Sequence, residues 1–171
     1  MRWQELFEDL ESQAESEERQ LADEEVAELR EAERGRIPLT DRLRGAVGRR
    51  LVLGVDGASH TGLVLEATRS WCVLRTDTRD VLVPTASVRW VEGVGRSAPA
   101  PGAAESRLSL AHVLRRLAAQ EEQVLVASAG RTLVGWIDGI GLDHVEVAVE
   151  GDGPVIAVPF SAITSVTLCP G

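Results

Sequence analysis

The chain has 171 residues, of which 44% are hydrophobic, so it can bury a substantial core. Its formal net charge of -9 is confined to one segment, because residues 1–34 hold 13 acidic residues and 4 arginines, while the remaining 14 acidic residues are matched by 14 arginines. A charge balance of zero outside this segment argues against a chain built mainly to bind nucleic acid.

The expected location follows from what the sequence lacks. The two cysteines, Cys72 and Cys169, have no metal or redox spacing, and no basic stretch followed by an apolar run opens the chain. The charge-free tract 153–171 is as long as a membrane span, but its prolines and strand-like alternation exclude that structure. All 18 basic residues are arginines, as in GC-rich genomes, so we expect a bacterial, cytoplasmic protein.

Residues 1–35 are predicted to form an acidic amphipathic helix. Its first half carries one apolar stripe at spacings of three and four residues, made of Trp3, Leu6, Phe7, Leu10 and Ala14. Gly35 and Pro38 are expected to end the helix. Because the stripe needs a partner surface, Trp3, Phe7 and Leu10 are candidate protein-interaction residues.

The rest of the chain contains an internal repeat. Residues 51–74 are matched by residues 124–147 at an offset of 73, with Gly57 and Gly62 matched by Gly130 and Gly135. The match resumes at an offset of 75, where the Val-Pro pair at 83–84 is matched by the pair at 158–159. Each copy is therefore predicted to be one folding unit that buries the same face.

Each copy is predicted to contain a short helix followed by about five strands. Thr40 and Ser109 are expected to cap helices over 41–47 and 110–121, and apolar alternation predicts the strands. A glycine inside the second strand of both copies indicates a sharp bend or a close backbone crossing, as in a small barrel. The predicted fold is mainly β with helices (α+β), with barrels at 36–93 and 107–171 and a linker at 94–106.

This arrangement resembles the Sm-like small β-barrel, present twice, over residues 39–92 and 108–168. Sm-like proteins commonly bind single-stranded RNA and assemble into rings through edge strands, and the resemblance implies such partners. The family's RNA-reading Asp and Asn positions are occupied by Thr68 and Cys72 in the first copy and by Gly141 and Val145 in the second. Val-Pro also replaces the family's Arg-Gly in both copies. The resemblance therefore predicts the fold more than RNA binding.

The copies differ on their predicted outer face. The first copy has Trp71, Val73, Leu82 and Trp90 where the second has His144, Glu146, Ala157 and Ser165. An apolar outer face is typical of a contact surface. Two interpretations stay open: the second copy or the N-terminal helix covers this face, which general compactness favours, or Trp71 and Trp90 are protein-interaction residues.

The densest basic stretch lies around the first short helix. The candidate phosphate contacts are Arg42, Arg44, Arg49, Arg50, Arg115 and Arg116. The alternative is that the acidic residues of 1–34 pair with these arginines. A related hypothesis is that residues 1–34 act as an acidic cover that competes with nucleic acid.

No catalytic motif is present, since the sequence contains no nucleophile elbow, HExxH or P-loop. Asp138, Asp143, His144 and Glu146 are more simply a solvated strand face than a metal site. We therefore expect no enzyme activity, no metal and no cofactor. The predicted function is a protein-interaction or scaffold module that binds a protein partner or forms a homo-oligomer, and the alternative is an RNA-associated regulatory factor.

Overall fold

The computed structural model describes residues 16, 19–32, 35–96, 98 and 108–169, and it divides into two compact units, 1–37 and 38–171. In the first unit, residues 19–32 form a helix whose side chains are exposed, among them Leu21, Val26 and Leu29. The Gly35 amide donates to the Glu31 carbonyl at 3.0 Å. Trp3, Phe7 and Leu10 lie outside the described residues.

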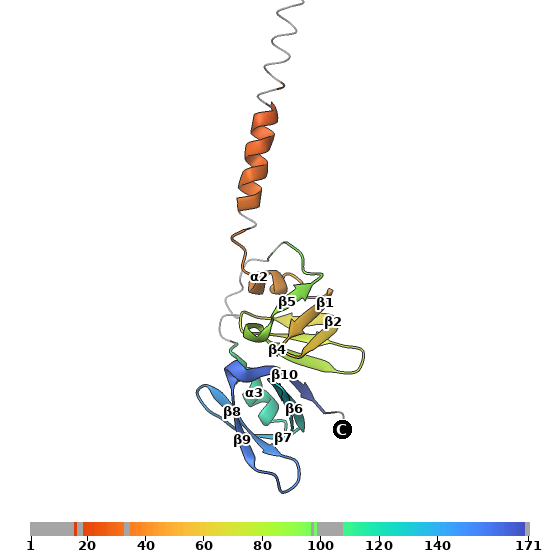
Figure 1. Ribbon diagram of the computed structural model, residues 1–171, viewed down its shortest axis with the longest axis vertical. Helices are drawn as coiled ribbons and strands as arrows, with labels where there is room; N and C mark the ends of the chain where they lie inside the picture. Colours follow the sequence, from red (N-terminus) through yellow and green to blue (C-terminus); the bar gives the residue numbers. More distant parts are fainter. Residues whose placement is uncertain (1–15, 17–18, 33–34, 97, 99–107, 170–171) are drawn as a thin grey trace, which may run out of the picture. The chain divides into compact units, whose positions relative to one another are not determined.

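The second unit is built on one antiparallel sheet of ten strands with short helices, which confirms the predicted α+β class (Figure 1). The strands of the first half are β1 (Arg50–Val55), β2 (Ala58–Ala67), β3 (Trp71–Arg75), β4 (Asp80–Pro84) and β5 (Trp90–Glu92). Those of the second half are β6 (Val124–Ser128), β7 (Arg131–Ile140), β8 (His144–Val149), β9 (Val155–Pro159) and β10 (Ile163–Leu168). The helices of this unit are α2 (Leu39–Arg44), α3 (Leu110–Ala118) and the short 3-10 turns η1 (Thr85–Ser87) and η3 (Phe160–Ala162).

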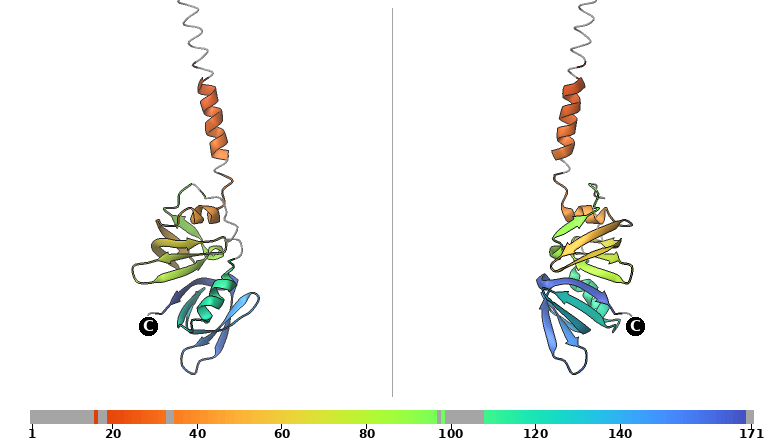
Figure 2. Two further views of the ribbon diagram at one scale, coloured as in Figure 1. Left: turned by 180° about the vertical axis from the view of Figure 1, so that it is seen from behind. Right: turned by 45° about the vertical axis from the view of Figure 1, so that its right-hand side comes forward.

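The strand order is β5-β1-β2-β3-β4-β10-β6-β7-β8-β9, so each half contributes five neighbouring strands in the same internal order. The halves meet where β4 pairs with β10, with Leu82 opposite Val166 and Val81 opposite Thr167. This junction can be followed in the two views of Figure 2. The terminal strands of the order are β5 and β9.

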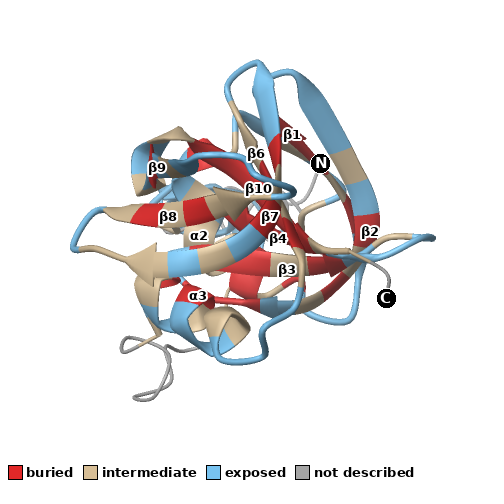
Figure 3. Cartoon of the chain, turned by 90° about the horizontal axis from the view of Figure 1, so that it is seen from below, coloured by how far each residue is buried: buried red, intermediate tan, exposed pale blue. Residues whose placement is uncertain are grey.

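Two hydrophobic clusters fill the unit, one in each half (Figure 3). Buried positions alternate with intermediate ones along much of β6 and β8, whereas β4 and β10 are buried over most of their length. The first cluster contains Leu43, Leu51, Leu53, Val64, Cys72, Leu74, Val81 and Val83. The second contains Leu110, Leu114, Val124, Val126, Val145, Val147, Ile163 and Val166. Trp71 and Leu82 come from the first half but belong to the second cluster.

The two short helices begin differently from one another. The side chain of Ser109 accepts the His112 amide at 3.2 Å and so caps α3 as predicted, although α3 ends at Ala118, before the predicted end. The bounds predicted for α2 were wrong by two residues at its start and three at its end. The helix spans Leu39–Arg44 and follows Pro38, whose side chain makes no capping bond. Thr40 thus lies inside α2 instead of capping it.

The mid-strand glycines stand where the backbones of neighbouring strands approach closely. A Cβ atom on Gly62 would lie 2.5 Å from the Arg75 carbonyl oxygen, and one on Gly135 would lie 1.9 Å from the Ala148 carbonyl oxygen. Both distances are too short for any side chain. The close approach predicted from these two glycines is confirmed.

Candidate functional site

Trp71 lies at the junction of the two halves. It is 3% exposed, and its indole N–H donates to the Leu108 carbonyl at 3.0 Å. Beside it lies a hollow of about 310 Å³, whose rim includes Glu66, His112 and Arg116. The second half therefore covers the apolar outer face of β3 and β4, as in the first of the two interpretations above.

Trp90 is the other tryptophan singled out in the first half, and it remains half exposed at 49%. It stands opposite Gly54 on the outer face of β5, and a Cβ atom on Gly54 would lie 2.0 Å from the Trp90 ring. One face of the indole therefore rests on backbone while its remaining surface is open to solvent. Trp90 keeps the surface exposure that an interaction residue needs.

Trp136 was not selected from the sequence, yet it is 41% exposed on β7. It lines a hollow of about 320 Å³ together with Ala118, Ile137 and two glutamates, Glu121 and Glu122. Trp71 and Trp90 stand out in the sequence because the second copy has no tryptophan at the matching positions. The opposite difference singles out Trp136, which stands in the second copy where the first has Leu63.

The basic stretch does not form one exposed patch. Arg44 is buried and its guanidinium contacts Asp41 at 3.0 Å, so it is not placed to bind phosphate. Arg42 donates to the Gly95 carbonyl at 2.8 Å and Arg49 to the Gly93 carbonyl at 3.4 Å. Arg50 lies 3.4 Å from Asp77. Arg115 and Arg116 are exposed on α3.

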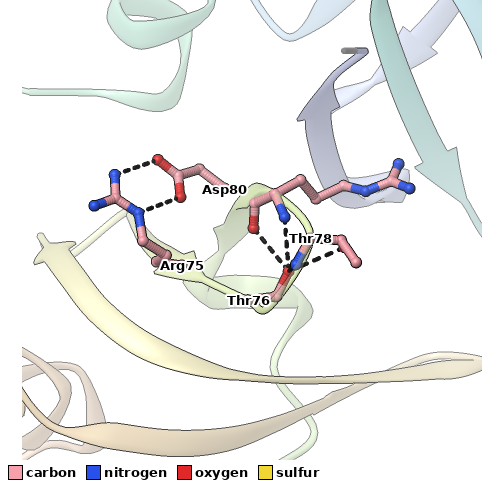
Figure 4. A network of polar contacts seen from close by, with 5 residues as sticks. Arg75, Thr76, Thr78 and Asp80 are labelled. Carbon is pink, nitrogen blue, oxygen red and sulfur yellow. Dashed lines mark hydrogen bonds and ion pairs between the residues drawn. The ribbon is translucent and has the colours of Figure 1, made fainter.

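Several aspartates on the first half form ion pairs with arginines on the surface. Arg75 holds Asp80 with two hydrogen bonds of 2.9 Å, next to a turn in which the Thr76 hydroxyl donates to the Arg79 carbonyl (Figure 4). The Arg75 guanidinium lowers the pKa of Asp80 through these hydrogen bonds. Arg89 lowers the pKa of Asp56 in the same way. These pairs neutralise arginines that could otherwise attract phosphate.

The ends of the strand order expose two edge strands. β9 carries no charged residue, and its outer residues Val155 and Ala157 are exposed, Val155 by 52%. β5 is only three residues long and carries Trp90. An uncharged edge strand presents unpaired backbone groups that readily pair with another strand.

Metal-ligating side chains are scattered over the residues that the structure describes. No group of three or more occurs among them, and His144 Nδ1 lies 2.9 Å from Asp143, in a hydrogen bond that lowers the pKa of that carboxyl group. Burial raises the pKa of the Cys72 thiol to about 12, so the thiol is neutral and a poor nucleophile. Among the described residues, no helix has the length and apolar character needed to cross a membrane.

No protein-family model matches this sequence, and no curated protein sequence matches it.

Proposed function

We propose that this chain is a non-enzymatic protein-interaction module that associates head to tail with further copies of itself, as a scaffold in the bacterial cytoplasm. In this proposal each half is a small Sm-like β-barrel that arose by duplication. The identical strand order of the two halves and the close backbone approach at Gly62 and Gly135 support this interpretation.

The observation that carries the proposal is the pairing of β4 with β10 inside the chain. In the strand order, β9 takes the place in the second half that β4 has in the first, and β5 takes the place of β10. The pair that joins the halves therefore has an unused counterpart, formed by β9 of one molecule and β5 of the next. Such a contact is heterologous, and its repetition gives a closed ring or an open filament.

The internal pair also predicts the register of this contact. Leu82 is opposite Val166 within the chain. The corresponding residues are Ala157 on β9, which lies opposite Glu146, and Val91 on β5, which lies opposite Leu53. We therefore expect Ala157 of one molecule to lie opposite Val91 of the next.

The contact between molecules is expected to be weaker than the one inside the chain. The internal junction buries Trp71 and Leu82, with Val73 packed beside them. The corresponding face of the second half offers His144, Glu146 and Ala157, which bury less apolar area. A weaker contact makes association reversible and dependent on protein concentration.

Two measurements test this function. Light scattering across a range of concentrations should show a mass that rises above that of the monomer. For the register, Val91→Cys and Ala157→Cys are purified separately in a Cys169→Ser background and mixed under mild oxidation. Only the mixture should form the mixed disulfide, because residues directly opposite on antiparallel strands have Cβ atoms about 4.5–5.5 Å apart.

The matched control mixes Val91→Cys with Ser161→Cys, because Ser161 is an exposed residue that lies just beyond β9. Equal cross-linking of the two mixtures would show random collision and would contradict the proposed register. A constant monomer mass at all concentrations would refute self-association itself.

A further inference from the structure

A row of apolar side chains crosses the outer face of the second half. Trp136 on β7 is opposite Ala148 on β8, and Ala148 is opposite Val155 on β9. Directly opposite residues in antiparallel strands point to the same face, with Cβ atoms about 4.5–5.5 Å apart. Trp136 and Val155 are 41% and 52% exposed, so the row is open to solvent.

The same three positions in the first half have a different chemistry. Leu63 on β2 is opposite Arg75 on β3, and Arg75 is opposite Asp80 on β4. Arg75 and Asp80 close on each other in the ion pair drawn in Figure 4. Two of the three positions are therefore occupied by an ion pair in the first half, whereas all three are apolar in the second half.

A hollow next to the row carries negative charge. It measures about 320 Å³, and its walls are the Trp136 indole, Ile137, Ala118 and the carboxylates Glu121 and Glu122. Neither glutamate forms an ion pair with the residues that the structure describes. A tryptophan face beside carboxylates attracts a guanidinium or ammonium group through cation–π and charge-assisted hydrogen bonds.

We propose that this surface binds an extended, basic peptide segment of another protein. An arginine or lysine of the segment occupies the hollow between Trp136 and the two glutamates. A neighbouring apolar side chain of the segment lies over Ala148 and Val155. The partner is therefore recognised by a cation and an apolar residue that are two positions apart, which is the spacing of side chains on one face of a strand.

This surface is separate from the proposed self-association. Within the chain, β4 is already paired with β10, yet the side chains of Arg75 and Asp80 remain 61% and 43% exposed. Pairing of β9 with a second molecule in the same manner leaves Ala148 and Val155 equally open. The row accordingly needs a different occupant.

The test uses the full chain and a fluorescent, capped peptide in which arginine and leucine alternate at every second position with serine between them, so that both lie on one face of the extended peptide; binding is titrated by fluorescence anisotropy. In the counterpart peptides each arginine is replaced by glutamate or by uncharged citrulline. The arginine peptide should bind, the glutamate peptide should not, and citrulline should weaken binding. Absence of saturable binding of the arginine peptide would overturn the proposal, whatever the light scattering shows about self-association.

Three variants locate the peptide. Glu121→Gln combined with Glu122→Gln removes the carboxylates, and Trp136→Leu introduces the residue found at the equivalent position of the first half. The double variant Ala148→Arg with Val155→Asp copies the Arg75–Asp80 pair onto the row, in a register that the first half already tolerates. Each variant should weaken the arginine peptide at least about threefold, the loss expected for a partly desolvated cation–π contact.

The charge control is the double variant Glu66→Gln with Glu92→Gln, which removes the same charge from exposed positions of the first half. It should leave peptide affinity unchanged. An equal loss in this control and in the Glu121/Glu122 variant would show that only net charge attracts the peptide, and would overturn the proposed site. Circular dichroism of each variant verifies folding.

Discussion

Truncation of Trp71 tests whether the second half of the chain covers the outer face of the first. Trp71→Ala removes a side chain that is 3% exposed and that belongs to the hydrophobic cluster of the second half. Tryptophan-to-alanine changes in such cores cost about 3–5 kcal/mol of unfolding free energy. Trp71→Phe keeps most of the apolar area but removes the hydrogen bond to the Leu108 carbonyl, which should lower the free energy of unfolding by about 1 kcal/mol.

The matched control is Trp90→Ala, because Trp90 is 49% exposed and only one face of its ring rests on Gly54. Its truncation should cost about 2 kcal/mol or less. Urea denaturation followed by far-ultraviolet circular dichroism measures all three variants. A loss below about 1 kcal/mol for Trp71→Ala would refute the buried junction, and so would a larger loss for Trp90→Ala than for Trp71→Ala.

Three further predictions concern single residues. Gly135→Ala should destabilise the chain by more than Gly130→Ala in urea denaturation, because a Cβ at position 135 would lie 1.9 Å from the Ala148 carbonyl oxygen. Gly130 (φ +76°) has open space around it, so Gly130→Ala should lose only the roughly 1–2 kcal/mol that a left-handed backbone costs alanine, and equal losses would contradict the close approach. Burial lowers the pKa of His60 below its usual 6.5, and its Nε2 has no hydrogen-bond partner among the described residues, so the folded state binds fewer protons than the unfolded state. The melting temperature should therefore be highest above pH 6.5 and fall as the pH drops below it, and His60→Gln should reduce that fall. Cys72, whose burial raises the thiol pKa to about 12, should react with iodoacetamide only after unfolding, whereas the half-buried Cys169 should react in the folded protein. If mass spectrometry locates a label on Cys72 in the folded protein, the hydrophobic cluster of the first half opens readily.

The local pattern of the sequence predicted much of the second unit. Apolar alternation predicted five strands in each half, and the Ser109 cap of α3 is confirmed. The paired inward positions Cys72 and Val145 are both buried. The start of α2 was missed because a proline can open a helix without a capping side chain, so Thr40 gave a misleading signal.

The candidate contact residues show where local pattern is insufficient. Trp71 and Trp90 both stood out as outward-facing tryptophans of the first half, yet Trp71 is buried by the second half and Trp90 is exposed. The arginines around α2 looked like one basic patch, but Arg44 turns inward to Asp41 and Arg50 turns to Asp77. Proximity in sequence does not reveal which carboxylate or carbonyl group a long side chain reaches.

The sequence by itself determined the strands, the close approaches at Gly62 and Gly135 and the position of the charge, because each depends on the alternation, backbone freedom or composition of a short segment. Only the tertiary structure decided that β4 pairs with β10, and consequently that Trp71 is covered while β5, β9 and Trp136 remain open. The physical reason is that strand pairing joins residues far apart in the chain: Leu82 and Val166 share a face through backbone hydrogen bonds that any sequence can form.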